Sequence, residues 1–167
     1  MPLTHPELVK HAAAWLQRKN PIVITEMVTY GEEADAIAFG TNGSFLIECK
    51  ATRSDFLSDK NKEFRRSPAQ GMGTYRYYMC SWSMIQTWEL PENWGLLWVK
   101  GKRIYNPVKA QPQDKSYSSE QRLLVSAIRR IPFMVKEGSE QPEGCNIKFY
   151  PSTLGKTATM GIEEDGA

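Results

Sequence analysis

The sequence of 167 residues predicts an α/β fold in which helices flank a mixed central sheet. Three features support this prediction: apolar residues at helical spacing near the N-terminus, short β-prone runs between turn residues, and an amphipathic charged segment between two of those runs. Hydrophobic residues make up 41% of the chain and charged residues 24%, which is ordinary for a globular protein. We expect one domain over residues 1–135, followed by a partly flexible C-terminal extension, 136–167, with an acidic tail.

The first half of the chain predicts the order helix, three strands, helix, strand. Leu8, Ala12 and Leu16 recur at helical spacing after a capping residue at Thr4, and Asn20-Pro21 ends that helix. β-Branched and aromatic runs give the strands, and a Gly-Thr-Asn-Gly segment has the composition of a hairpin turn. The expected elements are helix His5–Arg18, strand Pro21–Thr29, strands near Ala34–Phe39 and Ser44–Lys50, helix Arg53–Arg66 and strand Tyr75–Trp82.

The second half predicts another hairpin, one more helix and a late strand. Gly95–Lys100 and Arg103–Pro107 are β-prone runs on either side of a two-residue turn. Ser118–Arg130 carries an apolar stripe at helical spacing, and Pro132 is expected just past its end. Asn146–Tyr150 is expected to form an edge strand.

Composition argues against several protein classes. Cys49, Cys80 and Cys145 are odd in number and widely separated, which disfavours a disulfide framework or a zinc knuckle. No apolar run reaches the length of a membrane span, so no membrane partner is expected. The first twenty residues lack a basic stretch followed by an uninterrupted apolar run, as a signal peptide would have. We therefore expect a cytoplasmic protein.

The hairpin at residues 34–50 carries charged residues at one end. Strand alternation directs Glu48 and Lys50 to the same face of the second strand. Asp35 begins the first strand, and antiparallel pairing brings that start beside the end of the second strand, so the three residues should converge. Two converging carboxylates suit Mg²⁺ or Mn²⁺, and a nearby lysine can stabilise charge on a phosphoryl group. The chemistry indicated is metal-assisted phosphodiester hydrolysis, and a simple Glu48–Lys50 ion pair is the alternative.

A basic segment follows the hairpin. Seven basic and three acidic residues between Lys50 and Arg76 give this segment a charge of +4, although the whole chain carries only +2. A surface that faces a phosphate backbone is one interpretation, and a solvated helix face is the other. The candidate nucleic-acid-binding residues are Arg53, Lys60, Lys62, Arg65, Arg66 and Arg76.

The motif EADAIAFGTNGSFLIECKATRSDFLSDKNKEFRR resembles the PD-(D/E)XK nuclease superfamily, and within it the MmcB-like DNA-repair group. In that group an ADxIA strand, an IxEIK-like strand and an SRADF-like helix start recur, here at Ala34–Ala38, Ile47–Lys50 and Thr52–Phe56. With a later proline-glycine segment at Leu90–Leu97, the resemblance extends from about Leu8 to about Tyr105. Ala34 stands where the superfamily's name has a proline.

The resemblance implies a restriction-endonuclease-like core and a set of site residues. The implied metal ligands are Asp35, Glu48 and the backbone carbonyl of Cys49, and Lys50 is the implied catalytic lysine. The superfamily often has an additional acid in the first helix or first strand. Glu7 and Glu26 are candidates, and we favour Glu26 because it is expected in a strand next to the hairpin.

The function implied is an Mg²⁺- or Mn²⁺-dependent nuclease that acts on DNA in repair, recombination or a phage or mobile-element context. Two alternatives remain open. One is a non-catalytic nucleic-acid-binding or adaptor protein that keeps the fold, and the other is an RNA nuclease with the same chemistry. A homodimer would suit an enzyme that cuts both strands of a duplex.

Overall fold

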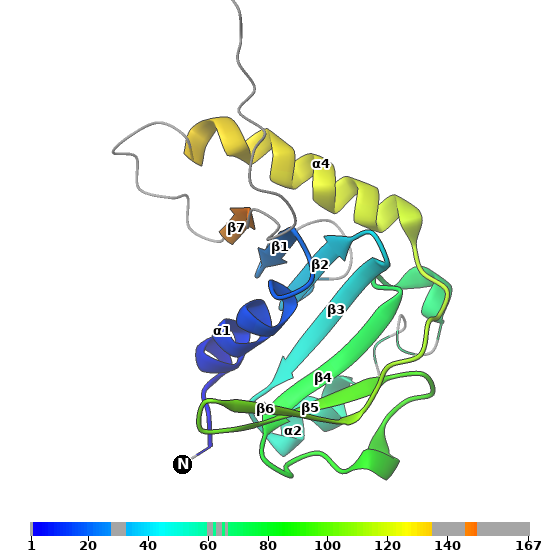
Figure 1. Cartoon of the computed structure of the whole chain (residues 1–167). Helices are drawn as coiled ribbons and strands as arrows, with labels where there is room; N and C mark the ends of the chain where they lie inside the picture. The colour runs from blue at the N-terminus through cyan, green and yellow to red at the C-terminus, as the bar shows by residue number, and fades with distance from the viewer. Residues whose placement is uncertain are drawn as a thin grey trace, which may run out of the picture.

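The computed structural model describes residues 2–27, 33–59, 62, 65, 67–134 and 146–149. These residues form a seven-stranded mixed sheet in the order β6-β5-β4-β3-β2-β1-β7 (Figure 1). In chain order the helices and strands are α1 His5–Leu16, β1 Ile22–Thr25, β2 Ala36–Gly40, β3 Gly43–Lys50, α2 Arg53–Asp59, η1 Pro68–Gln70, β4 Tyr75–Ser81, η2 Thr87–Glu89, β5 Gly95–Lys100, β6 Arg103–Val108, α4 Tyr117–Met134 and β7 Asn146–Phe149. The predicted α/β class and the order helix, three strands, helix, strand are confirmed.

Several boundaries differ from the sequence prediction for identifiable reasons. Helix α1 ends at Leu16 rather than Arg18, and the Asn20 side chain donates a hydrogen bond of 2.9 Å to the Leu16 carbonyl at that end. Strand β1 ends at Thr25, and the backbone of the next residue, Glu26, has a positive φ of 49° that is incompatible with a strand. Helix α2 ends at Asp59 instead of continuing to position 66.

Helix α4 is longer than predicted. It begins at Tyr117 and continues through Pro132 to Met134. A proline removes one helical hydrogen bond, but its fixed φ of about −65° is helical, so a helix can run past it near its end. Strand β7 pairs with β1 and forms the edge of the sheet, so the edge strand predicted within the C-terminal extension is confirmed.

The sheet has two buried faces. The apolar side of α1, including Leu8, packs with Ile47 on one face. On the other face, Phe56 of α2 and Leu123 of α4 belong to the same core as Leu46. Figure 1 shows α1 crossing one side of the sheet, with α2 on the opposite side. Since Glu48 and Lys50 alternate with Ile47, they belong to the α2 face.

The pairing of the central strands determines where the charged residues meet. Strands β2 and β3 form a hairpin around the two-residue turn Thr41-Asn42, and the positive φ of 111° at Gly43 favours glycine there. Strands β3, β4 and β5 are parallel, so their C-terminal ends lie at one edge of the sheet. We call this the carboxyl edge, defined by Lys50, Ser81 and Lys100.

Candidate metal and catalytic site

The hairpin brings Asp35 to the end of β3. The register pairs Ala36 with Ile47, so Asp35, one residue earlier, lies beside Glu48. The Asp35 Oδ2 atom accepts a hydrogen bond of 2.6 Å from the Cys49 backbone N–H. Its other oxygen lies 3.5 Å from the Nε2 atom of His5, at the start of α1. The expected convergence of Asp35 with the end of β3 is therefore present.

Glu48 and Lys50 are buried, with only 2% and 3% of their surfaces exposed. The Lys50 Nζ atom lies 3.2 Å from Glu48 Oε2 and 3.1 Å from Asp59 Oδ1. It also lies 3.9 Å from Asp55, whose side chain is about half exposed. Lys50 thus has acidic neighbours from both β3 and α2, and the predicted Glu48–Lys50 contact is part of a larger ionic network.

Asp59 is the centre of that network, and the sequence prediction missed it. It accepts hydrogen bonds of 2.7 Å from Arg65 Nε and 2.7 Å from the Tyr78 hydroxyl, and Lys62 lies 2.9 Å away. Arg65 also reaches Glu48 Oε2 at 3.2 Å, so the same cation contacts both carboxylates. Asp55 and Asp59 are spaced to share one helical face just after Lys50, and this is the sequence signal that could have identified Asp59.

The network fixes the charges of its members. Burial alone would lower the pKa of Lys50, but the charges of Glu48 and Asp59 raise it above its ordinary value, so Lys50 is a permanent cation. Burial alone would likewise raise the pKa of Asp59. The hydrogen bond and charge of Arg65, together with Lys50, instead hold that pKa well below its usual range.

The pKa of Asp35 shifts in the opposite direction to that of Asp59. Burial, with the nearby negative charge of Glu48, raises the pKa of Asp35 to about 7 from its ordinary value of 3.8. The Glu48 Oε1 atom is buried and, among the residues that the structure describes, has no hydrogen-bond partner. A carboxylate pair with an unsatisfied buried oxygen has the chemistry of a divalent-cation site, because a cation would satisfy that oxygen and compensate both charges. Asp35 and Glu48 therefore fit the implied Mg²⁺ or Mn²⁺ as its carboxylate ligands.

The cation would be held by few protein groups. Within the described residues, no three His, Cys, Asp or Glu side chains converge as a metal-binding cluster. Mg²⁺ commonly binds through one or two carboxylates and keeps several waters, so a two-carboxylate site suits that ion. The role of the Cys49 carbonyl as a further ligand stays a prediction.

The raised pKa of Asp35 makes a testable prediction for the metal-free protein. A raised pKa stabilises the fold fully below pH 3.8, and this contribution is lost as the pH rises through about 7. In EDTA, the stability of Asp35→Asn relative to wild type should therefore increase from pH 5 to pH 8, by about 3 kcal/mol. Urea unfolding of both proteins at the two pH values measures this difference, and a difference that does not change with pH would contradict it.

Two predicted nucleic-acid-binding residues are buried, which corrects their assignment. Arg65 is 8% exposed, pairs with Glu48 and Asp59, and its guanidinium lies 4.8 Å from the ring of Trp94. Arg76 is only 1% exposed. Its guanidinium donates to the backbone carbonyls of Pro68, Gly71, Gly73 and Asp114. Both arginines hold the fold together and neither faces a phosphate backbone.

The other predicted binding residues have different surroundings. Arg53 is half exposed and makes two hydrogen bonds with Glu89, of 2.6 and 2.7 Å, which occupy the face that would hold a phosphate. Lys62 is half exposed and contacts Asp59. The predicted residues Lys60 and Arg66 lie outside the described residues.

Glu26 is near the site but is not in a strand, which corrects its predicted setting. It follows β1, and its backbone N–H donates to the Asp35 carbonyl at 3.1 Å. Its side chain is 42% exposed and lies 3.8 Å from His5, which also contacts Asp35. A positive φ at a residue other than glycine is uncommon and is often found at functional sites. Its role as a metal ligand stays a prediction.

Comparisons with known proteins establish the fold and no more. No family model matches the chain, and no curated protein matches it. A solved structure, described as the SPO1766 protein of unknown function from Silicibacter pomeroyi, is similar with a TM-score of 0.59 and 20% sequence identity. The match covers 83% of this chain and 97% of that one. Among the described residues, no helix is long and apolar enough to span a bilayer.

Proposed function

We propose that this protein is a metal-dependent nuclease that hydrolyses DNA phosphodiester bonds. The observation that carries the proposal is the meeting of Asp35, Glu48 and Lys50 at one end of the β2–β3 hairpin, where a buried Glu48 oxygen has no partner within the described part of the chain. Its placement in repair, recombination or a mobile-element context comes from the family resemblance alone, as does the choice of DNA over RNA.

The roles follow from the surroundings of each group. Asp35 and Glu48 would hold Mg²⁺ or Mn²⁺, which supplies activation of water and neutralisation of phosphoryl charge. Lys50 stays protonated, so it acts as a fixed positive charge beside the reacting phosphate and not as a base. Asp59 and Arg65 act as positioning residues, because they hold Lys50 and Glu48 in place through ion pairs.

A second candidate is a non-catalytic nucleic-acid-binding protein with the same fold. One specific observation favours it: Glu48 and Lys50 are almost fully buried and have partners within the protein. In this alternative the ion network only stabilises the fold. A buried network of this kind is compatible with either role, because ion pairs perturb pKa values at structural sites too.

Cleavage assays distinguish the two. Purified protein should nick or degrade labelled DNA in Mg²⁺ or Mn²⁺, and activity should stop in EDTA. The panel includes single-stranded, duplex, flapped and branched DNA, with matching RNA substrates to assign the nucleic acid. Binding to DNA without cleavage of any substrate in either metal would contradict the nuclease proposal and support the second candidate.

A further inference from the structure

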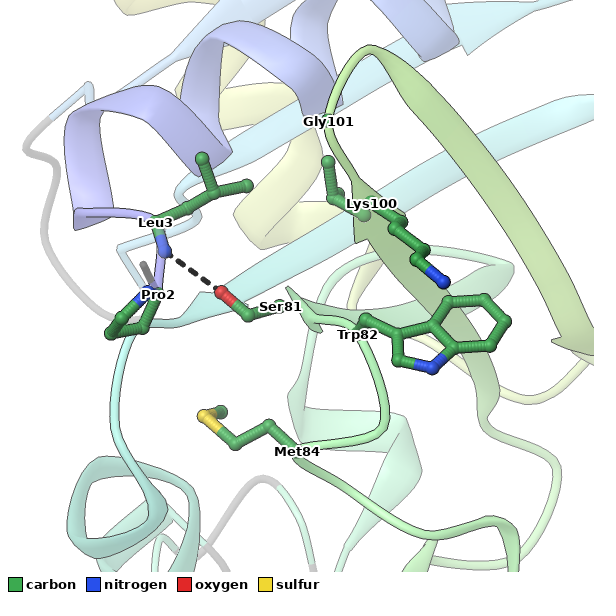
Figure 2. Close-up of a pocket in the computed structure, with 8 residues that line it drawn as sticks. Pro2, Leu3, Ser81, Trp82, Met84, Lys100 and Gly101 are labelled. Carbon is green, nitrogen blue, oxygen red and sulfur yellow. Dashed lines mark hydrogen bonds between the residues drawn. The ribbon is translucent and has the colours of Figure 1, made fainter.

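A pocket of about 570 Å³ opens at the carboxyl edge of the sheet (Figure 2). This volume lies in the range of small-ligand sites. Its walls come from the segment before α1, the turn after β4 and the end of β5. The residues that the argument uses are Pro2, Leu3, Ser81, Trp82, Met84 and Lys100.

Trp82 is an aromatic platform at the rim of this pocket. Its side chain is 44% exposed, so the indole is accessible to a ligand. The ring is supported from behind by Trp98 and Tyr105, with centroid distances of 5.2 and 4.8 Å. Its backbone N–H donates to the Val99 carbonyl at 2.9 Å, which ties the turn to β5. The indole is therefore held in place before any ligand arrives.

A lysine lies over the platform, and two further cations follow it in the chain. The Lys100 Nζ atom lies 5.0 Å from the centroid of the Trp82 ring, and Figure 2 shows the lysine alongside the indole. Lys102 and Arg103 follow at the exposed tip of the β5–β6 hairpin. No acidic residue occurs between Glu92 and Asp114. Within the described residues, Lys100, Lys102 and Arg103 have no ion pair. The sequence prediction missed this cluster because it lies outside the basic segment after the hairpin.

This combination matches the chemistry of a nucleotide. A nucleobase can stack on the indole, and the adjoining phosphate can pair with the lysine ammonium that now lies over the ring. Single-stranded nucleic acids are commonly bound in this way, by aromatic platforms combined with basic side chains. A base inside a duplex is already stacked on both sides, so it cannot use the platform without being extruded.

The pocket is connected to the candidate site by three contacts. Cys80, which precedes Ser81, is the register partner of Lys50. Leu3 donates its backbone N–H to Ser81 Oγ at 2.9 Å, and two residues later His5 contacts Asp35. The pocket and the proposed catalytic groups therefore lie at the same end of the sheet.

We propose that the Trp82–Lys100 pocket binds an unpaired nucleotide of a single-stranded DNA segment next to the proposed cleavage site. This inference rests on the proposed function for its choice of ligand. The substrate class is therefore single-stranded DNA or a single-stranded flap, because an unpaired base can stack on Trp82 without first being extruded from a duplex.

Binding in EDTA tests the pocket without cleavage. Fluorescence anisotropy with a labelled short oligothymidylate compares wild type with Trp82→Ala and Lys100→Ala. Trp82→Ala should weaken binding by about 5- to 100-fold, the loss expected for one stacked base, and Trp82→Phe should restore most of it. Lys100→Ala should weaken binding and reduce the slope of log affinity against log salt by about 1.

Two variants in the same chain are matched controls. Trp88 is 80% exposed and does not line the pocket, so Trp88→Ala should bind as wild type. Lys109 is exposed and directly follows β6, at the end of the β5–β6 hairpin away from its turn. Lys109→Ala should therefore have less effect on binding than Lys100→Ala. Thermal melting of each variant shows that the fold is retained.

The outcomes separate this inference from the proposed function. Trp82-dependent binding of single-stranded DNA without cleavage in any metal would support the pocket and contradict the nuclease. Metal-dependent cleavage with unchanged binding by Trp82→Ala would support the nuclease and overturn the pocket. The pocket is also overturned if wild type binds no single-stranded DNA, or if it binds a duplex equally tightly and without dependence on Trp82.

Discussion

Glu48→Gln should reduce Mg²⁺-dependent cleavage by about 10³-fold or more. The substitution keeps the size of the side chain but removes the negative charge from one of the two carboxylates proposed to hold the cation. Stabilisation by a catalytic metal contributes several kcal/mol to the transition state, and each 1.4 kcal/mol is about tenfold in rate. Single-turnover cleavage of the best substrate from the panel measures the loss.

Glu92→Gln is the matched control for this variant, because Glu92 is exposed and lies outside the charged network. It should cleave at the wild-type rate. Circular dichroism and thermal melting show whether Glu48→Gln is folded. A folded Glu48→Gln protein with activity within about threefold of wild type would contradict the assigned role of this carboxylate.

Asp59→Ala should lower the free energy of unfolding by about 3–5 kcal/mol, because removal of one partner leaves buried charges uncompensated. Asp59 is 1% exposed and contacts Lys50, Arg65 and the Tyr78 hydroxyl. Without it, Lys50 and Arg65 each lose a buried anionic partner, and the tyrosine hydroxyl loses its acceptor. Urea unfolding at neutral pH measures the change.

Asp55→Ala is the comparison variant for Asp59→Ala. Asp55 lies four residues earlier on the same helix, 3.9 Å from Lys50, but its side chain is 44% exposed. Because exposed ion pairs contribute little, Asp55→Ala should cost less than about 1 kcal/mol. Equal destabilisation by the two substitutions would show that Asp59 is not the centre of the network.

The β2–β3 hairpin was predictable because sequence patterns within a short stretch of the chain define it. Period-2 alternation and a Gly-Thr-Asn-Gly turn define the strands, and antiparallel geometry then places Asp35 beside Glu48. The β5–β6 hairpin was predictable for the same reason. Glu26 was placed wrongly because its positive φ depends on how the chain leaves β1, and no side-chain pattern records that angle.

The remaining site residues depend on tertiary contacts. Arg65 and Arg76 look like surface cations in the sequence, but one pairs with buried carboxylates and the other binds backbone carbonyls. Charge counting cannot distinguish such arginines from exposed ones. The Trp82 pocket was missed because its walls come from three segments that are distant in the chain and meet only at the carboxyl edge.

Metal binding is the most direct test of the central claim, that Asp35 and Glu48 share a divalent cation. Isothermal titration of metal-free protein with Mn²⁺ should show binding at one site in wild type and in Glu92→Gln. Asp35→Asn and Glu48→Gln should each lose that binding while remaining folded. No Mn²⁺ binding by wild type, or unchanged binding by both carboxylate variants, would contradict the claim.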